Sequence, residues 1–192
     1  MKIAVIGSPG SGKTTLSNGI FYFLKKDGKH VEIVPELIKY KVYKGEVFSD
    51  DGFDIQNTLE QKNFEKIFDQ AIKNGQLEYI ICEAPLCNGY FYASFYKKKL
   101  ERDVLKKIAS ESINSYDIIL FVQTAPKAEY VTFGRKESKS KSRKLQAHIE
   151  KEFKKLGFKN DLYYITQQTD MEIVLDLINK RPSESPHKNP IS

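Results

Sequence analysis

The sequence is poor in several residue types, and each shortage excludes a class of protein. It has no tryptophan, three histidines and two cysteines, and Cys82 and Cys87 lack histidine partners at the spacing of metal ligands. A disulfide framework and a zinc site are therefore not expected. No apolar run approaches the roughly 20 residues of a membrane-spanning helix, and the first residues do not resemble a signal peptide. We expect a cytoplasmic protein without a membrane partner.

Neither sign of charge dominates, although the basic residues exceed the acidic ones by 31 to 25 and the net charge is +6. The excess is spread over stretches with helical periodicity, so solvated helix faces explain most of it. No recognised nucleic-acid-binding motif occurs, and a nucleic-acid partner is the more distant alternative. The 192 residues suit one domain, placed at residues 1–180, with a tail over 181–192 that we expect to be disordered.

The most informative pattern that is present is a glycine-rich loop after a short apolar run. Residues 7–14 read Gly-Ser-Pro-Gly-Ser-Gly-Lys-Thr, which matches the phosphate-binding pattern G-x-x-x-x-G-K-[ST]. Such a loop aims backbone N–H groups and a helix N-terminus at one anion. We expect ATP there, with the Lys13 ammonium on its β- and γ-phosphates and the Thr14 hydroxyl on Mg²⁺. The expected nucleotide-binding residues are Gly7, Pro9, Gly10, Ser11, Gly12, Lys13, Thr14 and Thr15.

Short apolar runs alternate with amphipathic stretches along the chain. The runs predict strands at residues 2–6, 31–34, 78–82, 117–122 and 162–166. This alternation predicts an α/β fold in three layers, with a five-stranded parallel sheet covered by helices on both faces. Apolar residues at helical spacing predict the core faces of the helices, among them Leu59, Phe64, Ile67, Phe68, Ala71 and Ile72, then Leu100, Val104, Leu105 and Ile108, then Leu145, Ile149, Phe153 and Leu156.

Single acids follow the second and third predicted strands. Glu83 follows the third and is succeeded by Ala84 and Pro85, so the adjacent acids that hydrolytic motors usually carry are missing. The guanine-reading pattern of GTPases, Asn-Lys-x-Asp, is absent too. This favours transfer to a bound acceptor, with Glu83 helping Thr14 to hold Mg²⁺. Glu36 follows the second strand and would be the acceptor base, although a glutamate in a first helical turn is the alternative.

Three further groups of residues are candidates for contacts with the acceptor or the phosphates. The amides of Gln56 and Gln61 could pair with a nucleobase edge, and surface polarity explains them about as well. The aromatic side chains from Tyr90 to Tyr96 could wall an acceptor pocket or pack on the sheet. Basic residues over about 127–144, including Arg135 and Arg143, predict either a lid over the phosphates or a solvated helix start.

At these residues the chain resembles the NadR-like AAA domain family, small ATPases or kinases akin to the ribosylnicotinamide kinase domain and common in bacteriophages and bacteria. The resemblance covers about residues 1–178 and implies the strand order 2-3-1-4-5. A glutamate after the second strand and a glutamine on a later helix also occur in deoxynucleoside kinases, which implies a nucleoside-like acceptor. The residues that carry it are 7–15, Val34, Pro35, Glu36, Tyr40, Gln61, Glu83 to Leu86, which resembles the family's Asp-Ser-Pro-Leu turn, and Gly134 with Arg135.

The sequence therefore predicts an ATP- and Mg²⁺-dependent kinase for a nucleoside, nucleotide or related metabolite. The expected catalytic residues are Lys13, Glu36, Glu83, Arg135 and Arg143. Those expected at the acceptor are Glu36, Tyr40, Gln56, Gln61 and Tyr90. We expect a monomer or a homodimer. The alternative is an ATP-binding regulatory protein that has no small-molecule acceptor.

Overall fold

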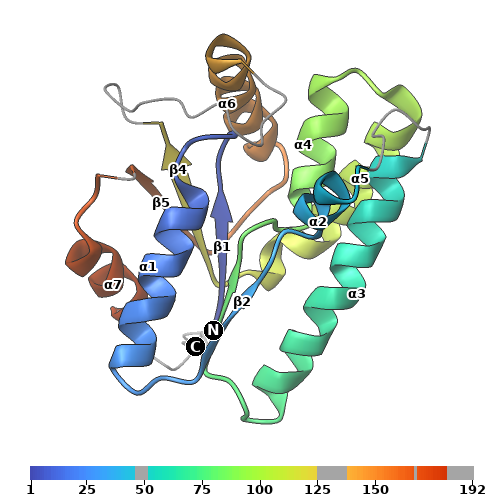
Figure 1. The fold of residues 1–192 in the computed structure, drawn as a ribbon. Coiled ribbons are helices and arrows are strands. Elements are labelled where there is room, and N and C mark those ends of the chain that lie inside the picture. Colours follow the sequence, from blue (N-terminus) through green and yellow to red (C-terminus); the bar gives the residue numbers. More distant parts are fainter. Residues whose placement is uncertain (46–51, 125–137, 167, 181–192) are drawn as a thin grey trace, which may run out of the picture.

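The computed structural model describes residues 1–45, 52–124, 138–166 and 168–180. Within these ranges five strands form one parallel sheet in the order β2-β3-β1-β4-β5 (Figure 1), which confirms the expected order. The strands also lie where the sequence predicts them. Their bounds are β1 Lys2–Ile6, β2 Val31–Val34, β3 Tyr79–Cys82, β4 Ile118–Gln123 and β5 Asp161–Thr166.

Helices cover both faces of the sheet and make the fold three-layered. One face is covered by α1 and α7, and the other by α3, α4, α5 and α6 (Figure 1). The short helices α2 and η1 lie in connections. The bounds are α1 Lys13–Lys26, α2 Leu37–Tyr43, α3 Phe53–Lys73, α4 Cys87–Phe95, α5 Lys99–Ser112, the 3₁₀ helix η1 Ile113–Ser115, α6 Lys139–Phe153 and α7 Met171–Asn179.

Strand β1 is the centre of the core and is apolar on both faces. Ile3 and Val5 pack in the cluster beneath α1 and α7, whereas Ala4 and Ile6 pack in the cluster beneath α4, α5 and α6. Successive side chains of a strand point to opposite faces, so a central strand with helices on both sides needs an unbroken apolar run. This is why the run before the glycine-rich loop does not alternate with polar residues.

The register of the sheet brings several strand ends to one edge. Val34 at the end of β2 pairs with Cys82 at the end of β3, and Cys82 pairs with Ala4 of β1. All strands run the same way, so the segments that follow β1, β2 and β3 leave the sheet at the same side. Ligands bind at this side of open α/β sheets. The glycine-rich loop, Glu36 and Glu83 are therefore neighbours.

Two of the predicted core faces differ from the observed ones. On α3, Phe64, Phe68 and Ile72 pack against the core as predicted, but Leu59 and Ile67 are 45% and 63% exposed. The most deeply buried positions of this helix are the polar Thr58, Gln61 and Glu65. On α5, Leu100 and Val104 are also exposed, while Leu105 is buried. The predicted stripe of α6 is confirmed, because all four of its apolar residues are buried. Periodicity locates an apolar stripe but does not detect polar groups that must reach the sheet.

Parts of two predicted segments lie outside the described residues. They are the tail over 181–192 and most of the basic segment over 127–144, of which residues 138–144 are described. Within the described ranges, no helix is long and apolar enough to cross a membrane.

Candidate functional site

The glycine-rich loop connects β1 to α1 and curls around its own lysine. Gly12 has φ of 98°, a left-handed conformation that non-glycine residues rarely adopt, and it caps the N-terminus of α1. A Cβ atom on Gly7 would lie 2.6 Å from the Ser11 hydroxyl and 2.6 Å from the Val122 carbonyl oxygen, so only glycine fits. The Lys13 ammonium donates to the carbonyl oxygens of Gly7, at 2.9 Å, and Ser8, at 3.0 Å. The lysine therefore spans the loop in which a phosphate would lie.

Helix α6 braces the loop from the side. The Gln146 side-chain oxygen accepts a hydrogen bond from the Ser8 backbone N–H at 2.7 Å. The Ser142 hydroxyl donates to the Pro9 carbonyl oxygen at 2.6 Å and lies 3.1 Å from the Ser8 hydroxyl. Ser8 and Ser142 are both buried. The end of the basic segment, at Ser142, and the next turn of α6, at Gln146, are thus attached directly to the phosphate-binding loop.

The two acids that follow β2 and β3 meet around one ammonium group. Lys39, on α2, has its Nζ atom 3.3 Å from a Glu83 carboxylate oxygen and 3.7 Å from a Glu36 carboxylate oxygen. The same ammonium donates to the Thr14 hydroxyl at 3.0 Å. Lys39 therefore joins the end of the glycine-rich loop to both acids. Lys39 is not among the residues that the sequence pattern indicates, and its one signal is its position one helical turn after Glu36.

The residues around this ammonium also fit a magnesium ion. The Thr14 hydroxyl and the Glu83 carboxylate offer hard oxygen ligands to one point, and a cation already occupies that point in the form of the Lys39 ammonium. Mg²⁺ is commonly bound by one or two carboxylates together with substrate phosphates. Within the described ranges no three His, Cys, Asp or Glu side chains gather at a metal-ligand spacing. Phosphate oxygens would accordingly complete the coordination.

A cavity of about 850 Å³ opens beside the loop and is lined by half of the expected site residues. Its size lies in the range of small-molecule and cofactor sites. Among its lining residues are Pro9, Gly10, Gly12, Lys13, Thr14 and Thr15 from the loop and α1, Glu36, Ile38 and Lys39 from the β2–α2 segment, Asn57 and Gln61 from α3, and Asn88, Tyr92, Tyr96, Lys98 and Lys141. The phosphate-binding loop and the expected acceptor base thus face one space.

Other expected site residues lie elsewhere. Tyr40 is 52% exposed and, with Gln56, lines a separate groove of about 370 Å³. Tyr90 is buried in the core, where its hydroxyl donates to Glu152, and it is not among the residues that line the cavity. Arg143 is exposed on α6, and Arg135 lies outside the described residues.

Two nearby aromatic residues, Tyr92 and Tyr96, line the cavity instead of Tyr90. Helix α4 directs its side chains to different sides, so Tyr92 reaches the cavity while Tyr90 points into the core. Lys141 of the basic segment also lines the cavity and holds its ammonium 4.5 Å from the centre of the Tyr96 ring. This distance lies within the range of cation–π attraction. The basic segment therefore contributes at least one cation to the cavity.

Lys98, which lines the cavity too, is held as a cation by acids. It forms an ion pair of 2.9 Å with Asp54 and lies 3.7 Å from Glu101. Partial burial alone would lower the pKa of Lys98, but these two carboxylates raise it above its ordinary value. Glu101 also accepts a hydrogen bond from the Asp54 backbone N–H at 3.0 Å, and this bond fixes the start of α3 against α5.

Comparison with known proteins identifies a family and a fold. The family model of the AAA domain matches residues 2–172. Deoxyadenosine kinase from M. mycoides is similar in structure, with a TM-score of 0.58 and 18% identity for the form with dCMP and a flexible dCDP, over 93% of this chain and 96% of that one. The form with dATP gives 0.55 at 18% identity over 93% and 100% of the two chains. The form with dCTP gives 0.54 at 16% identity over 94% and 100%.

The structural likeness, at 16–18% identity, shows the fold and agrees with the strand order of the sheet. Among the curated proteins no match to this chain was found. The likeness to ribosylnicotinamide kinases stays a prediction.

Proposed function

The chain belongs to the AAA domain family, and from that premise we propose that it is an ATP-dependent kinase that phosphorylates a nucleoside-like small molecule. The observation that carries the proposal is that the phosphate-binding loop and Glu36 face one cavity, with Glu83 and Thr14 held beside them by Lys39. A site for a triphosphate and a candidate base for an acceptor hydroxyl thus occur together. A kinase needs this pairing, whereas a protein that only binds ATP does not.

In the proposed reaction the acceptor hydroxyl oxygen forms a bond to the γ-phosphorus of ATP, and the bond from that phosphorus to the bridging oxygen breaks to release ADP. The hydroxyl proton passes to the Glu36 carboxylate. Phosphoryl transfer depends mainly on positioning and on neutralising charge. The Lys13 ammonium and the backbone N–H groups of the loop serve the second need. Mg²⁺, held by Thr14 and Glu83, would neutralise charge on the phosphates when it is bound.

The other cavity residues suit a planar, polar acceptor. Tyr92 and Tyr96 offer aromatic surfaces on which a base can stack, and Asn88 and Asn57 offer amide groups near them. Lys141 adds a cation beside Tyr96, whereas Arg143, one turn into α6, is exposed and does not line the cavity. The M. mycoides protein of the same fold is a deoxyadenosine kinase whose structure contains dCMP as a product, which supports a nucleoside-like acceptor.

The proposal is tested by finding an acceptor and then removing the base. A thermal-shift screen of nucleosides and nucleotides, with a non-hydrolysable ATP analogue present, identifies molecules that bind the native state. Glu36→Gln keeps the shape of the side chain but cannot accept a proton. We expect it to lower acceptor phosphorylation by about 10²- to 10⁴-fold while ATP affinity is retained.

Glu32→Gln is the matched control, because Glu32 lies on β2, is half-exposed and pairs with Lys25 away from the cavity. It should leave turnover unchanged. Full turnover in Glu36→Gln would reject Glu36 as base and point to an acceptor whose attacking oxygen is already ionised, such as a monophosphate. ATP hydrolysis that no acceptor accelerates would favour the regulatory alternative.

A further inference from the structure

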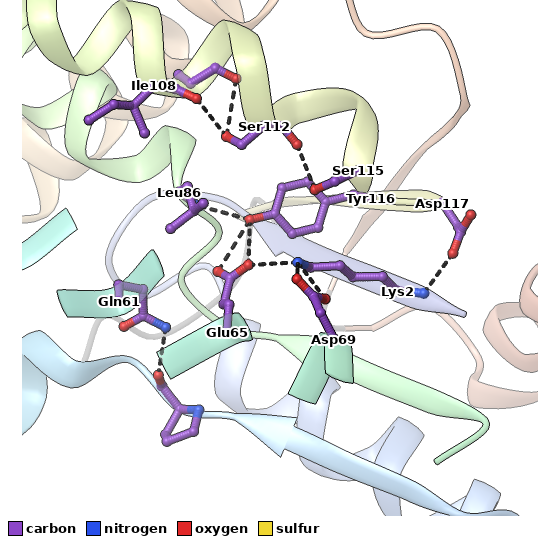
Figure 2. Close-up of polar contacts among 12 residues, drawn as sticks. Lys2, Gln61, Glu65, Asp69, Leu86, Ile108, Ser112, Ser115, Tyr116 and Asp117 are labelled. Carbon is purple, nitrogen blue, oxygen red and sulfur yellow. Dashed lines mark hydrogen bonds and ion pairs between the residues drawn. The ribbon is translucent and has the colours of Figure 1, made fainter. Parts of the chain in front are cut away.

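The most deeply buried residues of α3 are polar, which is unusual for a helix that packs on a sheet. Its fully buried residues are Thr58, Gln61 and Glu65, although apolar residues are available on the same helix. Gln61, Glu65 and Asp69 are spaced four residues apart and so lie on one face. Figure 2 shows all three directed toward polar partners on other segments. Phe64, Phe68 and Ile72 pack against the core too, so α3 buries these polar groups in addition to apolar ones, and the partners must offset the cost of burying them.

Gln61 holds the turn that carries Glu36. Its side-chain nitrogen donates to the Pro35 carbonyl oxygen at 3.0 Å, and its side-chain oxygen accepts from the Leu37 backbone N–H at 3.1 Å. The two bonds fall on the residues immediately before and after Glu36. Both ends of the Gln61 amide are engaged in this way, so the group that the sequence suggested for reading an acceptor also fixes the backbone around the base.

One turn further along α3, Glu65 reaches the turn that carries Glu83 through a tyrosine. The Tyr116 hydroxyl lies 3.0 and 3.2 Å from the two Glu65 oxygens and accepts from the Leu86 backbone N–H at 2.9 Å (Figure 2). Leu86 is the third residue after Glu83. Tyr116 has no exposed surface, and burial raises the pKa of its hydroxyl well above the ordinary value. The hydroxyl therefore stays protonated and can donate to Glu65 while it accepts from Leu86.

A buried lysine completes the arrangement and fixes Glu65. The Lys2 ammonium lies 2.9 Å from Glu65 and 2.9 Å from Asp69, and its nitrogen lies over the Tyr116 ring, 4.9 Å from the ring centre. Burial alone would lower the pKa of Lys2, but the two carboxylates raise it, so the lysine remains charged. A buried ion pair can often be replaced by apolar residues without loss of stability. The ion pairs of Lys2 with Glu65 and Asp69 are therefore better explained by the way they fix the Glu65 carboxylate.

We infer that α3 is a shared frame for the two acids of the site: Gln61 positions Glu36, and Glu65 with Tyr116 positions Glu83. Because both contacts come from one rigid helix, one turn apart, they set the separation between the acceptor base and the metal-binding carboxylate. The inference rests on the proposed function for the roles of these acids. Gln61, Glu65 and Tyr116 are positioning residues, since each acts on these acids through the backbone of a turn.

The contact that positions Glu83, the metal-binding carboxylate, is tested with Tyr116→Phe, which removes one oxygen atom from a buried side chain. Two quantities are measured by thermal shift: the affinity for an ATP analogue in EDTA, and the Mg²⁺ concentration that gives half of the added stabilisation at saturating analogue. We expect the first to change less than about twofold, since the phosphate-binding loop is not attached to Tyr116. The second should rise about 10- to 100-fold, the usual cost of losing a group that orients a metal ligand.

Tyr163→Phe is the matched control. It removes the same atom from a tyrosine of β5 that packs in the cluster on the other face of the sheet. The substitution should leave the Mg²⁺ requirement at the parent value, whatever it does to stability. An unchanged requirement in folded Tyr116→Phe, or an equal loss of affinity in EDTA, would overturn the inference. Neither measurement uses an acceptor, so failure of the kinase proposal would be seen separately.

The contact that positions Glu36, the proposed base, is tested with Gln61→Met. This substitution keeps the length of the side chain and removes both hydrogen bonds to the turn around Glu36. We expect kcat for the acceptor to fall about 10-fold or more, because small misplacements of a reacting group are costly, while the Mg²⁺ requirement stays unchanged. This opposite pattern would not arise from general loosening of the core. It also keeps the inference testable if Tyr116→Phe does not fold, since an unchanged kcat in Gln61→Met would refute the shared frame.

Discussion

At the scale of single residues, Lys39 has the most unexpected position. The sequence placed acids at the ends of two strands, and parallel strands have to bring those acids together, so Glu36 and Glu83 could be anticipated. Lys39 could not, because the chain has 31 lysines and arginines, and nothing in the pattern says which of them a short helix brings back to the acids. Its ammonium neutralises a Glu83 side chain that is only 9% exposed.

The neutralising role of Lys39 predicts a stability difference that depends on the ligand. Lys39→Met leaves the Glu83 carboxylate without this partner, and we expect the nucleotide-free protein to lose about 1–2 kcal/mol of stability, since Lys39 is partly exposed and solvent weakens the pair. With Mg²⁺ and an ATP analogue the loss should largely disappear, because the metal ion then compensates the carboxylate. Urea unfolding with and without ligand measures both values.

Lys29→Met serves as the comparison for Lys39→Met. Lys29 also pairs with a glutamate, Glu78, but at an exposed position away from the cavity. Its effect should be small and the same in both conditions. The same stability loss for Lys39→Met with and without ligand would show that Lys39 and the metal do not share the Glu83 carboxylate.

At the scale of elements, the strands were easier to predict than the orientation of the helices. A strand buried on both faces has to be apolar throughout, and a run such as Ile3 to Ile6 leaves no alternative. For α3, periodicity found a real apolar stripe, but Leu59 and Ile67 of that stripe face solvent. Polar contacts such as that of Gln61 with Pro35 decide how the helix is rotated, and they depend on partners distant in the sequence.

The contact between α6 and the phosphate-binding loop predicts that a helix residue influences nucleotide affinity without facing the nucleotide. Gln146→Leu keeps much of the side-chain volume but leaves the Ser8 backbone N–H without its acceptor. Losing a partner for a buried donor costs about 1–2 kcal/mol. We expect ATP affinity to fall roughly 5- to 30-fold by isothermal titration calorimetry, as the loop becomes less well ordered.

A second substitution on the same helix separates this effect from a general disturbance of α6. Lys151 is exposed near the other end of the helix, and Lys151→Ala should leave ATP affinity as in the parent. If Gln146→Leu bound ATP with the parent affinity, the bracing contacts would be structural only.

At the scale of the whole molecule, the glycine-rich loop is part of the core rather than an appendage. It follows the central strand β1 and begins α1, and Leu16 and Ile20 of α1 pack in the same cluster as Ile3 and Val5. Its pattern could be recognised from the sequence because a phosphate-binding loop needs particular residues at fixed spacing. The cavity beside it could not be predicted, since its walls come from several segments that only the fold brings together.

Because the loop is part of the core, we expect nucleotide binding to raise the Tm of the whole chain, and we expect Lys13 to be required for this increase. At a ligand concentration about 100 times Kd, binding contributes about 2.7 kcal/mol, which for a chain of this length corresponds to a Tm increase of roughly 5–10 °C. An ATP analogue with Mg²⁺ should produce such a shift in the parent protein. Lys13→Ala should reduce it to near zero, because this ammonium is the mobile cation of the loop.

The Lys13→Ala result has to be read against another lysine of α1. Lys25 lies at the far end of that helix and pairs with Glu32 on the surface, so Lys25→Ala should give the full shift. Lys13→Ala removes the hydrogen bonds to the Gly7 and Ser8 carbonyl oxygens. The Tm of the variant without ligand is therefore compared first with that of the parent, to show that the variant still folds. A Lys13→Ala protein that folds and still shows the parent Tm increase would mean that the triphosphate binds elsewhere, and the nucleotide site would have to be moved.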